Sequence, residues 1–151
     1  QIRQLAGEGL QFHLAVSLHA ANDKLRNRMV PINRKYPLDQ LISACKEYAY
    51  KTGKNIFIEY ALFDGINDSI HDADELAHLL DRLECSVNLI LGNPTNTNDF
   101  KPSSLELALA FQKKLIASGI RTMFRVPRGA DIEAGCGQLR SRWLDNKTQD
   151  L

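Results

Sequence analysis

The chain has 151 residues, of which 44% are hydrophobic and 25% charged, and its formal net charge is +1. That length suits a single domain over residues 1–151, and the composition is typical of a globular protein. A charge so close to zero argues against an overall electrostatic grip on nucleic acid. No apolar run approaches the ~20 residues of a membrane span, and no secretion signal is present. We therefore expect a cytoplasmic protein without a membrane partner.

Short apolar strands alternate with amphipathic helices along the chain. Strand-like runs cover residues 12–17, 55–62, 86–91 and 121–126. Between them, Asn22 caps a short helix, and Gly53 ends a longer helix that starts at Leu38. This alternation predicts an α/β fold with a parallel sheet and right-handed crossovers. Four strands do not close a barrel, so we expect an open sheet or the later part of a (βα) barrel.

Two further helices separate the later strands. Ser69 is a good N-cap for the first of them, whose apolar residues form one stripe. Ser103 and Glu106 fit a capping box at the start of the second. Gly119 then ends that helix before the last predicted strand.

Polar residues follow every predicted strand. In parallel βα architectures, ligands bind beyond the carboxyl ends of the strands. The residues at these positions are Ser17, Leu18 and His19 after the first strand, 64–68 after the second, Asn93 after the third, and 128–136 after the fourth. The sequence therefore predicts one polar rim, suited to a small polar ligand.

Cys136 lies between Gly135 and Gly137, just beyond the last predicted strand. Two flanking glycines leave the sulfur little neighbouring bulk and allow unusual backbone angles, so this thiol could approach another molecule closely. A glycine-rich turn with an unreactive thiol is the alternative, because reactivity also needs thiolate character. Cys45 falls on an apolar helical stripe and is expected to be buried, and Cys85 is expected to be structural. The three cysteines are too widely spaced for a disulfide framework or a cysteine metal site.

Charge is distributed unevenly. Residues 64–85 hold seven acidic residues against Arg82 alone, whereas residues 121–142 hold five arginines against Asp131 and Glu133. A basic end that also carries the glycine-flanked cysteine suits a phosphate-bearing partner. A solvated arginine face is the simpler alternative.

Several motifs together resemble one known family. They are residues 17–20 (SLHA), 30–38 (VPINRKYPL), 58–60 (IEY), 64–68 (DGIND), 87–90 (VNLI), 129–132 (GADI) and 136–139 (CGQL). They look like the radical S-adenosylmethionine RNA methyltransferases, which methylate adenine in 23S rRNA and, in some members, in tRNA. The resemblance covers nearly the whole chain and corresponds to about the C-terminal half of a member. It implies the C-terminal portion of a radical-SAM partial (βα)6 barrel, with an extra strand and a C-terminal loop.

The resemblance also implies residue roles. Cys136 would be the catalytic cysteine that receives a methyl group from S-adenosylmethionine, and Ser17, Leu18, His19 and Asn93 would contact the cofactor. In that family a [4Fe-4S] cluster cleaves a second cofactor molecule, and the resulting radical activates the S-methyl group for addition to adenine. Such chemistry suits carbon 2 of adenine, which has no acidic proton for an ordinary polar transfer.

The family's cluster cysteines and resolving cysteine are expected upstream of residue 1, because Cys45 and Cys85 match none of them. We therefore expect no metal ligand in these 151 residues, and a segment that is inactive alone. An electron donor for the cluster is an implied partner. Gly135 stands where many members have alanine, and residues 95–100 depart from the family's usual loop, which leaves RNA contacts there open.

Three alternatives remain at this point. The adenine carbon-8 methyltransferases that confer antibiotic resistance share most of these motifs. A cluster-less RNA-binding or assembly module with the same fold would fit the arginines near the end. A thiol enzyme could use Cys136 as nucleophile and His19 as base, although no spacing supports that pair. Separately, an unpaired strand edge along residues 12–17 predicts that the chain self-associates.

Overall fold

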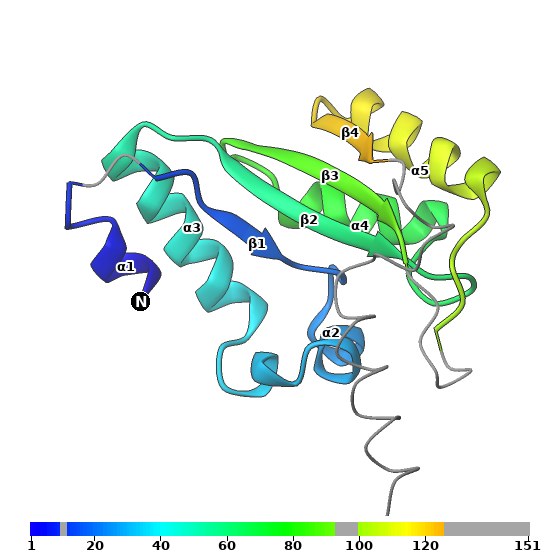
Figure 1. The fold of residues 1–151 in the computed structure, drawn as a ribbon, viewed down its shortest axis with the longest axis horizontal. Helices are drawn as coiled ribbons and strands as arrows, with labels where there is room; N and C mark the ends of the chain where they lie inside the picture. Colours follow the sequence, from blue (N-terminus) through cyan, green and yellow to red (C-terminus); the bar gives the residue numbers. More distant parts are fainter. Residues whose placement is uncertain (10–11, 93–99, 126–151) are drawn as a thin grey trace, which may run out of the picture.

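A computed structural model describes residues 1–9, 12–92 and 100–125 of the chain (Figure 1). Its elements are α1 (Ile2–Leu5), β1 (Ala15–Ser17), α2 (Asp23–Met29), the 3-10 helix η1 (Pro31–Arg34), α3 (Leu38–Thr52), β2 (Ile56–Leu62), α4 (Ile70–Leu79), β3 (Cys85–Leu91), α5 (Leu105–Ala117) and β4 (Arg121–Arg125). None of the helices in these ranges has the length and apolar character needed to cross a membrane.

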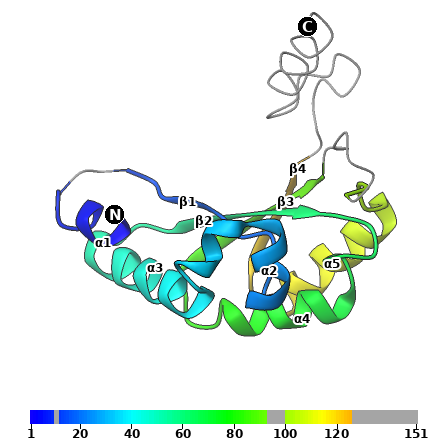
Figure 2. The same ribbon diagram turned by 90° about the horizontal axis from the view of Figure 1, so that it is seen from below.

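The four strands form one parallel sheet, as predicted, and their order is β1-β2-β3-β4. In one row across the sheet, Val16 pairs with Ile58, Ile58 with Val87, and Val87 with Thr122. Helices α3, α4 and α5 all lie on the same side of the sheet (Figure 2). The carboxyl ends of the strands therefore share one edge, and the opposite face carries no helix in the described part of the chain.

The core lies between the sheet and its helices. Alternate residues of β2 point into it, so Ile58 and Tyr60 are fully buried. Helices α3, α4 and α5 each contribute large buried side chains, and the ring of Phe111 from α5 lies 5.4 Å from the ring of Tyr60. Cys45 of α3 is also fully buried, as predicted, and burial raises the pKa of its thiol to about 11. The amphipathic stripes of the sequence thus form one continuous core.

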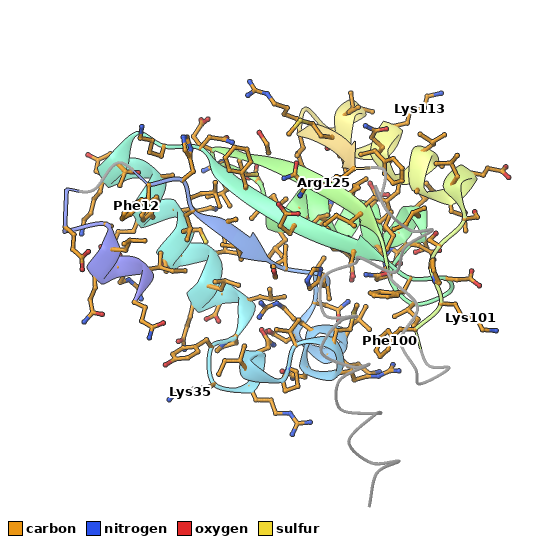
Figure 3. The ribbon with its side chains drawn as sticks, viewed as in Figure 1. Phe12, Lys35, Phe100, Lys101, Lys113 and Arg125 are labelled. Carbon is orange, nitrogen blue, oxygen red and sulfur yellow. The ribbon has the colours of Figure 1, made fainter. Side chains whose placement is uncertain are left out.

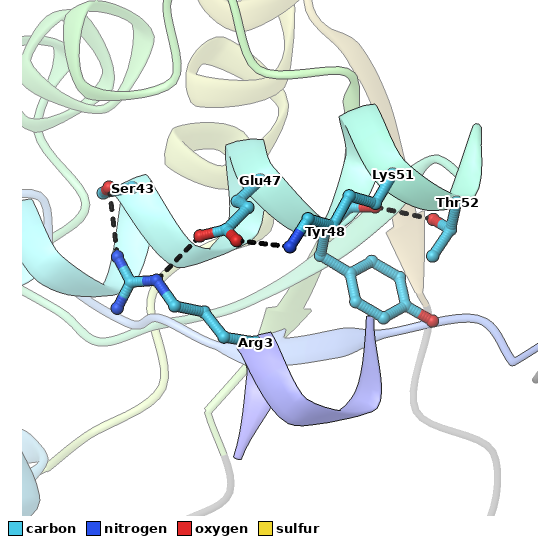
Figure 4. A network of polar contacts seen from close by, with 6 residues as sticks. All are labelled: Arg3, Ser43, Glu47, Tyr48, Lys51 and Thr52. Carbon is cyan, nitrogen blue, oxygen red and sulfur yellow. Dashed lines mark hydrogen bonds and ion pairs between the residues drawn. The ribbon is translucent and has the colours of Figure 1, made fainter. Parts of the chain in front are cut away.

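Helix α1 is attached to the outer side of α3 by a small polar network (Figure 4). Arg3 Nε donates to Glu47 Oε2 at 2.8 Å, and Lys51 Nζ donates to Glu47 Oε1 at 2.7 Å. These ion pairs are largely exposed, so each stabilises the fold only weakly. Buried Tyr48 makes a firmer link, because its hydroxyl donates to the carbonyl oxygen of Phe12 at 2.9 Å. That bond ties the segment before β1 to α3.

The predicted boundaries differ from the structure at the first strand and at the cap of α5, and by one residue at the starts of β2 and β3. The first strand covers Ala15–Ser17 rather than residues 12–17. The capping box of Ser103 and Glu106 is wrong, because Ser104 is the N-cap of α5 and its hydroxyl accepts from Leu107 N at 3.2 Å. Ser103 is buried, and its hydroxyl donates to Asp68 instead. By contrast, Ser69 caps α4 as predicted.

Replacing the N-cap of α5 should destabilise the fold. We expect Ser104→Ala to lower the free energy of unfolding by about 1 kcal/mol, because the backbone N–H of Leu107 loses its acceptor. Urea denaturation measures this change. Ser43→Ala, at an exposed position inside α3, is the matched control and should stay within about 0.5 kcal/mol. Equal losses in the two variants would contradict the assignment of the cap.

Candidate functional site

The predicted rim begins where β1 ends. Ser17 is exposed, whereas Leu18 is fully buried and packs in the core. The backbone N–H of Leu18 donates to the carbonyl oxygen of Glu59 at 2.9 Å. Any contact that Leu18 makes to a ligand must therefore come from its backbone. Of the two, only Ser17 offers a side chain at the surface.

His19 takes over the pairing with β2 where the β1 ladder stops. Its backbone is in the left-handed region, with φ of 60°, which is uncommon for a residue other than glycine. This turn brings the imidazole back to the sheet, and Nδ1 accepts from the backbone N–H of Ala61 at 3.0 Å. The imidazole thus accepts the hydrogen bond that a backbone carbonyl would accept if β1 continued along β2. Since Nδ1 is an acceptor, the proton of the neutral ring is on Nε2.

The environment of His19 favours the neutral ring. Burial lowers the pKa of the imidazole, and the nearby positive charge of Arg26 lowers it further, while Glu59 acts in the opposite direction. A neutral His19 has one N–H to donate and cannot carry a permanent positive charge at pH near 7. The sequence prediction of His19 as a polar contact at the rim is compatible with this state.

Asn67 connects the ends of β1 and β2. Its Nδ2 donates to the carbonyl oxygens of His19 at 2.8 Å and of Ala61 at 2.7 Å, and its Oδ1 accepts from Phe63 N at 2.7 Å. The side chain is fully buried. An amide has one acceptor and two donor hydrogens, and all are used here. Asn67 therefore holds the strand ends together, and its side chain is not available to a ligand.

The same holds for Asp68, whose carboxylate is buried and engaged. Its Oδ1 accepts from Gly65 N at 3.1 Å, and its other oxygen accepts from the hydroxyl of Ser103. The prediction that residues 64–68 present a set of polar side chains to a ligand is therefore wrong for Asn67 and Asp68. These two residues shape the loop from inside.

Arg26 holds the turn after β1 through hydrogen bonds to the backbone of that turn. Its guanidinium is almost entirely buried and donates to the carbonyl oxygens of Ser17 at 3.2 Å and Leu18 at 3.0 Å. A third bond runs from Nη1 to Asn33 Oδ1 at 2.6 Å. Burial lowers the pKa of Arg26, opposed by the attraction of Asp23. A buried cation in contact with two backbone carbonyls fixes the path of the segment that carries His19.

The helix-free face of the sheet carries two polar side chains beside this turn. Glu59 and Asn88 pair across β2 and β3, and Asn88 Nδ2 donates to Glu59 Oε1 at 2.8 Å. Ser17 lies in the same row, next to Glu59. Sequence reasoning did not select Glu59 as a site residue. The alternation of residues 55–62 could have found it, because it places Glu59 opposite the buried Ile58 and Tyr60.

Gly92 closes the rim on the side of β3. A Cβ at this position would lie 2.2 Å from a ring carbon of Phe63, so only glycine fits beneath that ring. The backbone N–H of Gly92 donates to the carbonyl oxygen of Leu62 at 3.0 Å. The ring of Phe63 also meets the ring of Phe100 at 5.1 Å, next to Lys101 (Figure 3). These contacts therefore fix the backbone as far as Gly92, the residue before Asn93.

Two predicted site residues, Asn93 and Cys136, lie outside the described residues. Within residues 1–9, 12–92 and 100–125, no group of three His, Cys, Asp or Glu side chains is placed to hold a metal ion. The structure brings Ser17 and Glu59 together as neighbours in the sheet, and His19 lies close enough to Glu59 for their charges to interact. This set offers both donors and acceptors to a polar ligand at the carboxyl edge of a parallel sheet.

Comparison with known proteins defines the class first and then the family. The search against family models found no match. Among solved structures, a radical SAM methyltransferase from Sphaerobacter thermophilus superposes with a TM-score of 0.87 at 50% identity, over 91% of this chain and 40% of that chain. A domain of a pyruvate-formate lyase-activating enzyme from Bacteroides vulgatus shares the fold alone, with a TM-score of 0.63 at 13% identity. The fold is thus that of part of a radical-SAM α/β barrel.

Curated relatives indicate the kind of methyltransferase more narrowly than the solved structures do. The probable dual-specificity RNA methyltransferase RlmN of Clostridium tetani is 46% identical over 151 residues, which is 100% of this chain and 43% of that protein. The protein of the same name from Pelotomaculum thermopropionicum is 50% identical over 143 residues, covering 93% and 39% respectively. As its motifs predicted, the chain is similar over nearly its whole length to RNA methyltransferases of the radical S-adenosylmethionine type. It spans about two fifths of the length of these relatives.

The buried amide of Asn67 gives a sharp test of the rim. In Asn67→Asp, a carboxylate would face the carbonyl oxygens of His19 and Ala61 without a hydrogen to donate. We expect the free energy of unfolding to fall by at least about 2 kcal/mol. Asn27→Asp is the control, because Asn27 accepts from Asn33 through its oxygen, which a carboxylate retains. Chemical denaturation that finds the two variants equally stable would overturn this role of Asn67.

The lowered pKa of His19 predicts a pH dependence of stability. In the unfolded state the imidazole has its ordinary pKa of about 6.5, whereas burial in the folded state lowers this pKa, so stability should fall as the pH drops below 6.5. His19→Asn, which tolerates the left-handed backbone, should flatten this slope. His71→Asn removes an exposed histidine and should leave the slope unchanged. Urea melts across this pH range measure the effect, and an unchanged slope in His19→Asn would contradict it.

Proposed function

We propose that this chain forms the methyl-accepting part of an RNA methyltransferase that modifies carbon 2 of adenine in 23S rRNA, with tRNA as a second substrate. The observation that carries the proposal is the 46–50% identity, over 93–100% of the chain, to relatives named as dual-specificity RNA methyltransferases. The match in fold to a radical SAM methyltransferase supports it. The activity, substrates and partners named for these relatives belong to proteins of which this chain matches about two fifths.

The rim suits S-adenosylmethionine, which supplies a methyl group when bound and a radical when cleaved at an iron–sulfur cluster. We assign cofactor contacts to Ser17, to the backbone of Leu18, to His19 and to Asn93. The exposed hydroxyl of Ser17 and the Nε2–H of His19 can donate to a carboxylate or a ribose oxygen, while the held turn keeps both in place. A neutral His19 also avoids repulsion with a positively charged sulfonium.

Cys136 is the thiol that we assign as methyl acceptor. The other two cysteines suit this role poorly, because burial raises the pKa of both Cys45 and Cys85 to about 11. A thiol with so high a pKa is almost wholly protonated at neutral pH and is a weak nucleophile. Cys136, between two glycines, has little neighbouring side-chain bulk in the sequence.

We further propose that the cluster is held outside these 151 residues, together with the contact to an electron donor. The edge of β1 that faces away from β2 would then pair with another part of a longer protein. For the chain alone, the same edge favours self-association through a two-fold contact.

The test is methylation in cells. A strain in which this coding sequence is disrupted should lose 2-methyladenosine from nuclease digests of its 23S rRNA, as measured by mass spectrometry against 2-methyl and 8-methyl standards. Restoring the gene with Cys85→Ala should recover the product, because that thiol has no assigned role, whereas Cys136→Ala should not. Full recovery with Cys136→Ala would reject the assignment of the methyl acceptor, and loss of 8-methyladenosine instead would reject carbon 2.

A further inference from the structure

Four exposed cations gather on α2 and the turn that follows it. They are Lys24 and Arg28 on α2, and Arg34 and Lys35 at the end of η1. Lys24 and Arg28 are four residues apart and therefore project from one face of the helix. The side chain of Lys35 reaches outward from the protein (Figure 3). With Tyr36, these residues form what we call the α2–η1 basic surface.

In the described part of the chain, none of the ion pairs includes Lys24, Arg28, Arg34 or Lys35. Asp23 and Asp39 are the acidic residues nearest to these cations in the sequence, and Asp23 accepts through Oδ1 from Asn33 Nδ2 at 2.7 Å and from Leu38 N at 3.0 Å. One oxygen of Asp23 is thus engaged by the turn, and the four cations outnumber the two carboxylates. A surface of uncompensated positive charge is the electrostatic footprint of a phosphate-rich partner.

The α2–η1 basic surface is fixed relative to the rim. Buried Asn33 donates to Asp23 and to Asn27 Oδ1 at 2.9 Å, which clamps η1 against α2. Asn33 in turn accepts from Arg26, the residue that holds the carbonyl oxygens of Ser17 and Leu18. One continuous buried network therefore joins the exposed cations to the turn that presents Ser17 and His19. A polyanion bound to the cations would lie beside the rim.

Tyr36 distinguishes this surface from a simple solvated basic face. Its side chain is 50% exposed, and Lys35 Nζ lies 5.5 Å from the centre of its ring. An exposed aromatic ring beside cations can stack an unpaired base while the cations bind the flanking phosphates. The acidic stretch 64–85 would repel the same partner from the region of α4, which limits the ways in which it can dock.

We propose that the α2–η1 basic surface binds the phosphate backbone of the substrate RNA next to the reaction rim. The identification of the partner as RNA rests on the proposed function, whereas the charge arrangement does not. In this geometry Lys24, Arg28, Arg34 and Lys35 contact phosphates, and Tyr36 stacks on a base that is no longer paired. The contacts are independent of sequence and position the RNA without selecting the adenine.

The experiment measures binding of the chain to a fluorescent adenine-containing RNA stem-loop of about 20 nucleotides, by anisotropy at several salt concentrations. We expect Arg28→Glu combined with Arg34→Glu to weaken binding at least about tenfold and to reduce the slope of log affinity against log salt by about one to two. The control is Lys46→Glu combined with Lys113→Glu, which makes the same charge change on α3 and α5. Lys113 lies at the far side of the protein (Figure 3).

The control should stay within about twofold of the unchanged chain, since its cations do not touch the RNA. Circular dichroism checks that both double variants fold, and Tyr36→Ala, a surface change, should weaken binding several-fold without altering the salt slope. Equal losses in the two charge variants, no loss in either, or no RNA binding by the unchanged chain would each overturn the proposal. Charge-dependent RNA binding at this surface together with unaltered 2-methyladenosine in the disrupted strain would reject only the proposed function.

Discussion

The rim of this protein depends on how the open end of β2 is satisfied after β1 stops at Ser17. Beyond that point, Ala61 N, Ala61 O and Phe63 N have no strand partner on the β1 side. His19 Nδ1 accepts from the first, and the amide of Asn67 pairs with the other two. The side chains of His19 and Asn67 thus take the place of the backbone hydrogen bonds that a longer β1 would make to β2. Because buried backbone groups must be paired, the positions of both residues are strictly determined.

This constraint explains why the turn after β1 can be polar, strained and yet ordered. A left-handed His19 costs conformational energy, which the surrounding hydrogen bonds must offset. Arg26 contributes from the other side by holding the carbonyl oxygens of Ser17 and Leu18. Asn67 and Arg26 hold the turn from buried positions, whereas the side chain of Ser17 is exposed. His19 holds the turn through Nδ1, so only its Nε2–H could serve a ligand.

The sequence predicted the framework well, because its signals are local. Period-two and period-3.6 patterns located the strands and helices, and the caps at Asn22, Ser69 and Gly53 are those in the structure. The choice between Ser103 and Ser104 failed for a nonlocal reason. Both serines could cap α5, and the decision rests on Asp68, 35 residues away, which takes the hydroxyl of Ser103.

Hydrogen bonds between residues far apart in the sequence also limited the prediction of the site. A polar loop at residues 64–68 looked like a ligand surface, but the structure turns Asn67 inward to partners that include His19, 48 residues away. Glu59 lies in a run that predicts a strand, and a strand pattern alone does not show which side chains meet on its outer face. Only the register of β1, β2 and β3 shows that it lies between Ser17 and Asn88 on the helix-free side. Strand position follows from sequence, whereas the partner of a buried polar group depends on the assembled fold.

Native-state hydrogen exchange followed by NMR tests the central claim most directly. If the side chains of His19 and Asn67 complete the ladder, the amides of Ala61 and Phe63 should exchange as slowly as those in the middle of β2, within about tenfold. Their exchange would then require the cooperative opening of the strand. Exchange of these two amides at the rate of exposed turn amides, while the middle of β2 stays protected, would contradict the account.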